Sequence, residues 1–223
     1  MGLSTLRRKI HQASLISATA ARDGVRPLRL ARRAIQEFGA VQRTWELQSL
    51  LGLVLRRTPL TVVEIGTYLG GTLACWPAVS DPGARLVSID MIQEPENLER
   101  RSSNVERIRR QLTPRQRLIE IEGDSHSAQT LTRLKAVLDD DPVDLLWIDG
   151  DHSYEGITAD MEMYAPLVRR GGLIALHDIH GSAAFPTSQC HTYWREAKRR
   201  YRTAEFIADR SAGAGMGIGV IFP

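Results

Sequence analysis

The feature that most constrains the fold of this chain is a regular alternation, from residue 60 onward, of short apolar runs with longer charged segments. The apolar runs are rich in Val, Ile and Leu, as in buried strands, and the charged segments have the length and pattern of amphipathic helices. Such strands and helices form a parallel sheet with helices on both faces, so the sequence predicts a doubly wound α/β fold. We expect strands at 61–66, 85–90, 117–122, 143–149 and 172–177, and helices at 72–76, 96–112, 127–138 and 154–168.

The end of the chain predicts a departure from this parallel order. A helix at 191–201 precedes two closely spaced strands, 204–208 and 217–222. The connection between these strands is too short for the helical crossover that a parallel pair needs. At least one of them should therefore run antiparallel.

Residues 1–57 form a basic segment that precedes this pattern. They carry a formal charge of +8, whereas the rest of the chain carries −5. Apolar residues recur at helical spacing within 28–38 and 47–54, so we predict a basic helical extension, 1–57, before an α/β domain at 58–223. No aromatic residues interleave with the arginines as in single-strand nucleic-acid platforms. A homo-oligomer contact or a lid over the site is therefore favoured over nucleic-acid binding.

Composition and length favour a single cytoplasmic domain. A chain of 223 residues suits one domain with a substantial core. No apolar run reaches the roughly 18–20 residues of a membrane helix, and the N-terminus lacks the apolar core of a secretory signal. Cys75 and Cys190 are too few for a disulfide framework. We therefore expect a cytoplasmic protein without a membrane partner.

The turn after the first expected strand has the composition of a ligand-binding loop. In an open α/β sheet, ligands bind beyond the carboxyl ends of the strands, where glycine allows close backbone approach. The spacing departs from the G-x-G-x-x-G pattern of dinucleotide sites. Glu64, within the strand, suits the ammonium group of an amino-acid cofactor, whereas a pyrophosphate prefers neutral amides. The turn holds Gly66, Thr67, Tyr68, Gly70 and Gly71.

Acidic residues after the next two strands complete a nucleoside site. Asp90 ends the second strand and is placed to accept hydrogen bonds from two ribose hydroxyls. Asp124 follows the third strand and is placed to meet an adenine amino group, with Ser125 beside it. Together with Glu64, these residues favour S-adenosylmethionine, which joins an adenosine to an amino acid.

Two clusters of titratable residues follow the fourth and fifth expected strands. Asp149 and His152 follow the fourth, and His177 and Asp178 follow the fifth. Adjacent parallel strands end at the same rim, so these side chains should meet. Carboxylates there suit Mg²⁺ or another divalent metal, which would act as a Lewis acid and hold substrate oxygens. His152 is placed to take a proton, because its unperturbed pKa lies near neutrality.

From Leu60 to its end, the chain resembles the class I S-adenosylmethionine-dependent methyltransferases. This resemblance implies a Rossmann-like, mostly parallel seven-stranded sheet with an antiparallel terminal strand. The similar segments are VEIGTYLGG (63–71), VSID (87–90), EGDS (122–125), WIDGDHSYEG (147–156) and RRGGLIALHD (169–178). The last two of these look like segments of macrolide-sugar O-methyltransferases and the cephalosporin hydroxylase-like family.

The resemblance also implies roles for individual residues. Metal-dependent O-methyltransferases of this kind place one acid after strand four and a pair of ligands after strand five. Aligned with that pattern, Asp149, His177 and Asp178 are the metal ligands, and His152 is similar to the base of the sugar methyltransferases. The departure is His177, where those relatives usually carry an acid. Imidazole is a poorer ligand for Mg²⁺ and a better one for transition metals.

We therefore expect an S-adenosylmethionine-dependent O-methyltransferase, assisted by a divalent metal, that acts on a hydroxyl of a small polar acceptor. The resemblance favours a sugar or a glycosylated natural product, and a catechol or phenol acceptor stays open. An iron-dependent hydroxylase with a facial triad, or a nucleic-acid methyltransferase, is a further alternative. The predicted site comprises catalytic His152 and Asp149, metal-binding Asp149, His177 and Asp178, and cofactor-binding Glu64, Gly66, Thr67, Tyr68, Gly70, Gly71, Asp90, Asp124, Ser125 and Asp149.

Overall fold

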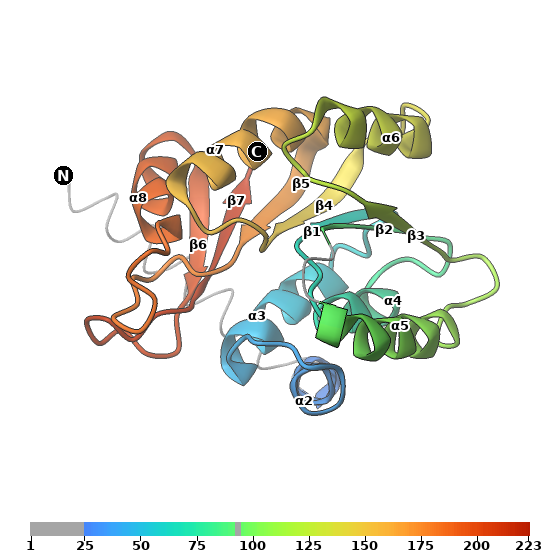
Figure 1. Ribbon diagram of the computed structural model, residues 1–223, viewed down its shortest axis with the longest axis horizontal. Coiled ribbons are helices and arrows are strands. Elements are labelled where there is room, and N and C mark those ends of the chain that lie inside the picture. Colours follow the sequence, from blue (N-terminus) through green and yellow to red (C-terminus); the bar gives the residue numbers. More distant parts are fainter. Residues whose placement is uncertain (1–24, 92–94) are drawn as a thin grey trace.

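The computed structural model describes residues 25–91 and 95–223, which contain a seven-stranded sheet (Figure 1). The strand order is β3-β2-β1-β4-β5-β7-β6. Among the strands of the described residues, β7 alone runs opposite to the other six, which confirms the predicted fold class. The strands are β1 (Thr61–Ile65), β2 (Arg85–Asp90), β3 (Arg117–Glu122), β4 (Val143–Ile148), β5 (Val168–Leu176), β6 (Arg202–Phe206) and β7 (Ile218–Phe222).

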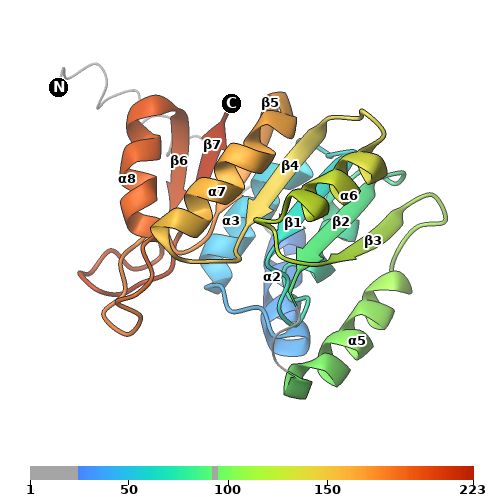
Figure 2. The same cartoon turned by 45° about the horizontal axis from the view of Figure 1, so that its top comes forward.

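Helices cover both faces of the sheet, as Figures 1 and 2 show. One face is covered by α2 (Val25–Phe38), α3 (Thr44–Leu55), α4 (Trp76–Val79) and α5 (Pro95–Arg109). The other is covered by α6 (Ala128–Leu138), α7 (Tyr154–Tyr164) and α8 (Cys190–Arg200). Within the described ranges, none of the helices is long and apolar enough to cross a membrane.

The largest shift from the expected boundaries lies between α7 and β5. The helix expected at 154–168 ends at Tyr164, and a 3₁₀ turn at Ala165–Leu167 carries Pro166. Proline does not continue a helix beyond its first turn, because it lacks the backbone N–H group. The fifth strand consequently begins at Val168, four residues before the expected start at 172.

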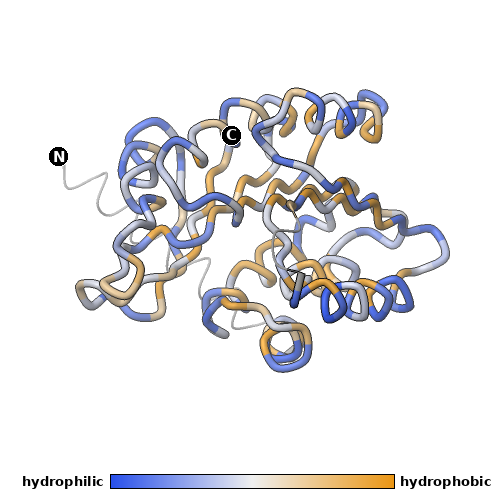
Figure 3. The backbone as a smooth tube through the Cα atoms, in the orientation of Figure 1, coloured by the Kyte–Doolittle hydropathy of each residue, from blue (hydrophilic) through white to orange (hydrophobic). Residues whose placement is uncertain are grey.

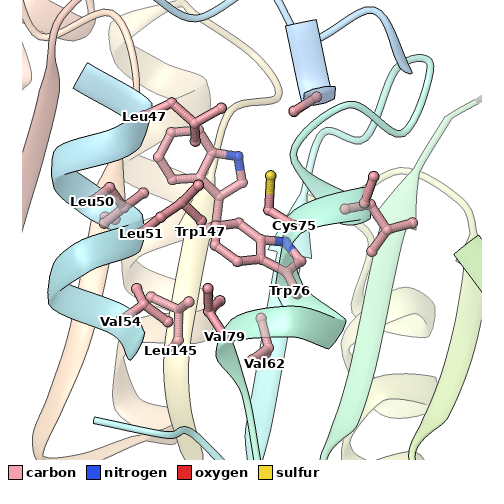
Figure 4. Close-up of a cluster of buried hydrophobic side chains, with 14 of the residues drawn as sticks. Leu47, Leu50, Leu51, Val54, Val62, Cys75, Trp76, Val79, Leu145 and Trp147 are labelled. Atoms are coloured by element: carbon pink, nitrogen blue, oxygen red, sulfur yellow. The ribbon is translucent and has the colours of Figure 1, made fainter. Parts of the chain in front are cut away.

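The apolar side chains of the strands form a core on each side of the sheet. In Figure 3 the central strands carry much of the hydrophobic colour. On the α2–α5 side, Trp147 of β4 lies 6.3 Å from Trp76 of α4, between ring centroids. Leu47 and Leu50 of α3 pack into the same cluster (Figure 4). These side chains are fully buried and fix α3 against the centre of the sheet.

The helices that precede the sheet share this core. Ala31, Ala34 and Phe38 of α2 are buried together with the α3 residues and the sheet. The predicted boundary at residue 57 therefore divides the sequence pattern but not the core of the described residues. Of the predicted basic extension, residues 1–24 lie outside the described residues, and a role in a homo-oligomer stays a prediction.

Candidate functional site

The glycine turn after β1 is packed directly against the end of β4. Gly66 has a φ of +80°, and a Cβ atom there would lie 2.1 Å from the backbone oxygen of Asp149. Both observations require glycine, because other residues rarely adopt this φ and their Cβ would clash. The backbone N–H of Asp149 also donates to Ile65 O at 2.8 Å. The turn and the end of β4 are thus in fixed contact.

Asp90 anchors the turn from the end of β2. Its Oδ2 accepts hydrogen bonds from the backbone N–H groups of Thr67 and Tyr68, each at 2.6 Å. The same oxygen lies 3.0 Å from the guanidinium of Arg101, whose side chain is 8% exposed. Arg101 was not predicted, because nothing in the charged helix around it distinguishes one arginine from the others. Asp90 therefore holds the shape of the turn in addition to facing the cavity described next.

A first cavity of about 650 Å³ lies above the turn, within the size range of small-molecule sites. Several residues of the predicted cofactor site line it, namely Gly66, Tyr68, Asp90, Asp124, Ser125 and Asp149. The lining also includes residues that were not predicted as cofactor-binding, namely Ile65, Ile89, Met91, Asn97, Arg101, Gly123, His126, Gly150, Asp151 and His152. Strand ends β1 to β4 all contribute to it, as expected for this fold.

The loop after β3 is supported from below by α7. The hydroxyl of Tyr164 donates to Ser125 O at 2.6 Å, and the backbone N–H of His126 donates to Asp124 Oδ1 at 2.9 Å. These bonds fix the loop on one wall of the first cavity. Tyr164 was not predicted here, since the helix pattern shows that its side chain is buried but not which loop it meets.

Two residues of the predicted cofactor site, Glu64 and Gly70, line neither this cavity nor the second one described below. Glu64 is fully buried, accepts a hydrogen bond from Thr72 Oγ1 at 3.1 Å and another from Trp76 Nε1. Burial raises its pKa to about 8. The prediction that Glu64 meets the cofactor is not supported, because strand alternation turns its side chain toward Trp76, below the rim of the sheet. Gly70 closes the turn, donating from its N–H to Thr67 O at 2.8 Å.

Four titratable residues meet at the ends of β4 and β5, as predicted. Asp149 Oδ1 lies 3.0 Å from His177 Nδ1 and 3.4 Å from His152 Nε2. Asp178 Oδ2 lies 3.0 Å from His152 Nδ1. Asp178 has a φ of +56°, a left-handed conformation that costs energy in residues other than glycine. We call Asp149, His152, His177 and Asp178 the Asp–His cluster.

The charges within the Asp–His cluster stabilise one another. Hydrogen bonding to Asp149 and then to Asp178 raises the pKa of His152 to about 10. Burial alone would lower the pKa of His177, but the charge and hydrogen bond of Asp149, together with the charge of Asp178, outweigh it and the pKa is raised. Burial would raise the pKa of Asp149 and Asp178, but the two histidines hold both values low. The pKa of His152 therefore lies well above the near-neutral value of an unperturbed imidazole.

The Asp–His cluster does not fit the predicted divalent metal in this arrangement. Asp149 Oδ2 accepts a hydrogen bond from Gln42 Nε2 at 2.7 Å, and Asp149 Oδ1 and Asp178 Oδ2 face imidazole nitrogens. A cation would have to replace these donors, and His177 stands where a Mg²⁺ site needs an oxygen ligand. Among residues 25–91 and 95–223, no three His, Cys, Asp or Glu side chains are arranged to hold a metal ion.

A second cavity, of about 360 Å³, lies on the other side of the Asp–His cluster. Its walls come from the α2–α3 loop (39–42), from Ser182, Ala184 and Phe185, and from residues 214–216. Thr67, Gly71 and Thr72 close it toward the glycine turn, so Thr67 and Gly71 of the predicted cofactor site face this cavity and not the first.

The two cavities share one wall. Gly66, Tyr68, Asp149 and His152 line both of them. A compound bound in the first cavity and one bound in the second would therefore meet beside Asp149 and His152. Such an arrangement suits transfer of a group from one bound molecule to another, with an acid–base residue at the junction.

Comparison with known sequences agrees with this arrangement. Residues 63–179, more than half of the chain, match the methyltransferase domain family. The uncharacterized protein R132 of Acanthamoeba polyphaga mimivirus is 29% identical over 140 residues, which are 57% of this chain and 55% of that protein. The chain thus spans about half the length of this relative.

Solved structures of similar fold include several methyltransferases. Cofactor-bound Rv0187 from MTB has a TM-score of 0.60 and 20% identity, with 87% of each chain covered. The O-methyltransferase from Bacillus cereus in complex with S-adenosylhomocysteine has a TM-score of 0.59 and 17% identity, covering 92% of this chain and 90% of that one. The mycinamycin-pathway methyltransferase MycE, solved with Mg and S-adenosylhomocysteine, has a TM-score of 0.56 and 16% identity, covering 87% and 53%. The chain therefore belongs to the methyltransferase domain family and has the class I S-adenosylmethionine-dependent methyltransferase fold.

Proposed function

We propose that this protein is an S-adenosylmethionine-dependent O-methyltransferase that acts on a hydroxyl group of a small, uncharged acceptor. The cofactor occupies the first cavity, and the acceptor occupies the second. The observation that carries this proposal is the shared wall, because Asp149 and His152 line both cavities. A methyl donor in the first cavity and a hydroxyl group in the second both come within reach of His152.

The lining of the first cavity fits the proposed cofactor. Asp90 lies at the end of β2, where it is placed to meet ribose hydroxyls. Asp124 and Ser125 line the part of the cavity where the amino group of an adenine ring would lie. Gly66 lines the same cavity, so its backbone is placed to contact the methionine part of the cofactor. When bound, S-adenosylmethionine supplies a methyl group that a nucleophilic oxygen can attack in line.

The Asp–His cluster supplies the acid–base chemistry. Attack by a hydroxyl oxygen requires that its proton be removed, and His152 Nε2 is the nitrogen nearer to the shared wall through its contact with Asp149. Asp178 holds Nδ1 of the same ring at 3.0 Å, as the acid of a catalytic dyad holds its histidine. His152 acts as the base in its neutral form, and the two carboxylates then stabilise the imidazolium that it becomes.

The raised pKa of His152 matches this base to a weakly acidic hydroxyl. Proton transfer is efficient when donor and acceptor have similar pKa values, and a phenol has a pKa of about 10. The pKa of His152, about 10, is in the same range. No metal ion is part of the proposed mechanism, because the donors around Asp149 do not fit one.

The second cavity favours an acceptor with an apolar body. Val41, Tyr68 and Phe185 line it although they are 56%, 50% and 66% exposed. The hydroxyls of Thr67 and Thr72 are already bonded, to Ser88 and Glu64. Outside the Asp–His cluster, the polar side-chain groups left for a polyhydroxylated ring are those of Gln42 and Ser182 and the hydroxyl of Tyr68. None of the described residues that line this cavity is Lys or Arg. We infer that a neutral phenol fits this lining better than the sugar that the resemblance favours.

Labelled S-adenosylmethionine tests this function directly. The protein is incubated with it and with matched panels of phenols, sugars and anionic phenol derivatives. We expect S-adenosylhomocysteine and a labelled ether product with neutral phenols. Cofactor binding without transfer to any hydroxyl compound would contradict the proposed reaction, and transfer to sugars alone would contradict the proposed acceptor class.

A further inference from the structure

Gln42 lies outside the strand ends and donates a side-chain hydrogen bond to a carboxylate of the Asp–His cluster. It lies in the loop between α2 and α3, 107 positions before Asp149 in the sequence. Its Nε2 donates to Asp149 Oδ2 at 2.7 Å, and the residue is only 7% exposed. A buried side chain of a connecting loop thus contacts an acid of the proposed active site.

The loop that carries Gln42 is fixed at both ends. On one side, Asn104 Nδ2 donates to Phe38 O at 3.2 Å and to Leu69 O at 2.8 Å, which ties the end of α2 to the glycine turn. On the other side, a guanidinium nitrogen of Arg43 donates to Ala214 O at 2.9 Å. The place of Gln42 is therefore set by contacts that do not involve Asp149.

The close approach of this loop depends on a missing side chain in the glycine turn. A Cβ atom at Gly71 would lie 2.3 Å from the backbone nitrogen of Ala40, so only glycine allows this contact. Gly71 was predicted to contact the cofactor. Its surroundings instead show that it admits the loop that carries Gln42.

The orientation of the Gln42 amide is set by Asp149. Its Oε1 is buried and has no hydrogen-bond partner among the described residues. An unpaired buried oxygen destabilises a protein, so the orientation must be retained for the bond that Nε2 makes. Turning the amide over would place Oε1 against the carboxylate, which repels it.

The two oxygens of Asp149 thereby have separate partners. Gln42 occupies Oδ2, and Oδ1 is left to face His177 Nδ1 at 3.0 Å and His152 Nε2 at 3.4 Å. A carboxylate that lost the Gln42 bond could rotate about its last torsion, because such torsions have broad minima. Both imidazoles would then lose a fixed partner.

We propose that Gln42 is a positioning residue, which holds the Asp149 carboxylate in the rotation that orients His177 and His152. The consequence for methyl transfer rests on the proposed function, whereas the consequence for the imidazoles does not. The α2–α3 loop thus takes part in organising the active site in addition to lining the second cavity.

Two variants separate this role from a role in folding. Gln42→Met keeps a side chain of similar length without a donor, and Gln42→Glu keeps the shape but places an acceptor against Asp149. Gln36→Met is the matched control, since Gln36 is exposed on the adjoining helix α2. Each protein is labelled with ¹⁵N-histidine, and its imidazole resonances are recorded together with its thermal midpoint.

We expect the Nδ1–H resonance of His177 and the resonances of His152 to move in both Gln42 variants and to stay unchanged in Gln36→Met. We also expect kcat to fall roughly 10- to 100-fold, the scale for loss of precise orientation, with a smaller change in the KM for S-adenosylmethionine. If Gln42→Met does not fold, Gln42→Glu gives the same comparison.

Imidazole resonances that match those of the unmodified protein in a folded Gln42 variant would overturn the proposal. So would resonances that move equally in Gln36→Met. Because these spectra need no acceptor, they distinguish failure of the Gln42 proposal from failure of the proposed function, which would appear as absence of methyl transfer by the unmodified protein.

Discussion

Asp178 Oδ2 lies 3.0 Å from Nδ1 of His152, so an acid in a left-handed backbone conformation holds one nitrogen of the proposed base. The other nitrogen lies 3.4 Å from Asp149, at the wall between the two cavities. In the proposed mechanism the nitrogen that faces Asp178 orients the ring and the other transfers the proton, so the roles of the two acids are separable by substitution.

Replacing His152 should remove most of the activity and leave cofactor binding nearly intact. We expect His152→Ala to lower kcat by about 10²–10⁴-fold, the usual range for a lost general base. The control is His180→Ala, because His180 bonds to Ser211 O and lines neither cavity. Titration calorimetry with S-adenosylhomocysteine measures the affinity. An equal loss of activity in both variants would argue against the base.

The rate of methyl transfer should rise with pH. His152 has a pKa of about 10 in the protein without bound acceptor, so its neutral, basic form grows about tenfold per pH unit below that value. Asp178→Asn removes one of the carboxylates that raise this pKa, so the rise in kcat/KM should move to lower pH. Profiles of kcat/KM for the acceptor check this, because this ratio reports the ionisation of the enzyme before the acceptor binds. A kcat/KM that is flat from pH 6 to pH 9 would contradict the assignment.

Removal of divalent metal should leave the rate unchanged. The oxygens of Asp149 are bonded to Gln42 and His177, and His177 replaces an oxygen ligand, so we expect kcat in a chelator to stay within about twofold of the untreated rate. A large loss that added Mg²⁺ or a transition metal restores would show that the cluster rearranges around a cation.

Glu64 should make the protein less stable as pH rises. Burial raises its pKa to about 8 in the folded protein, above 4.5, the ordinary value expected in the unfolded chain. Between these values the folded state holds a proton that the unfolded state has lost, so the free energy of unfolding falls as pH increases from 4.5 to about 8. Glu64→Gln should remove this decline, which amounts to a few kcal/mol at most. Chemical denaturation at pH 5 and pH 8 measures it.

The exposed Glu99→Gln is the matched control for that experiment. It should leave the pH dependence as it is in the unmodified protein. If Glu64→Gln also leaves it as it is, the buried carboxyl group is not its source.

Replacing Asp90 should lower the free energy of unfolding and also weaken cofactor binding. Asp90→Ala leaves the N–H groups of Thr67 and Tyr68 and the side chain of Arg101 without their shared partner. We expect a loss of about 1–3 kcal/mol in the free energy of unfolding together with weaker S-adenosylhomocysteine binding. Asp124→Ala is the comparison, since this half-exposed side chain lines the same cavity but accepts one backbone hydrogen bond, from His126, and its loss should therefore lower stability less. Equal stability in the two variants would contradict the anchoring role of Asp90.

Much of the fold could be predicted because most of the strands contain runs of β-branched and aliphatic residues, which the charged helical segments separate. The meeting of Asp149, His152, His177 and Asp178 was also predictable, since neighbouring parallel strands end at one rim. Which acid faces which histidine within the Asp–His cluster was not predictable, because this pairing depends on side-chain rotation. The raised pKa of His152 was not predictable for the same reason, because it depends on which acids face the two ring nitrogens.

Contacts between distant segments could not be predicted from local patterns. The apolar stripe of α2 shows that one face is buried, but not that its following loop delivers Gln42 to Asp149. Similarly, the position of Glu64 in a strand gives an alternating direction, but which face meets Trp76 is decided by the packing of α4.

The absence of a side chain at Gly66 has a consequence for which substitutions could alter the acceptor of the proposed enzyme. The main chain of Gly66 touches the carbonyl of Asp149 without an intervening side chain. The spacing between the glycine turn and the segment that carries Asp149 and His152 is therefore set by main-chain contact alone. The second cavity, in contrast, is also walled by two loops that lie outside the glycine turn and the end of β4, through Ser182, Ala184, Phe185 and residues 214–216. Substitutions in those loops could exchange one acceptor for another while the distance over which the methyl group travels remains the same.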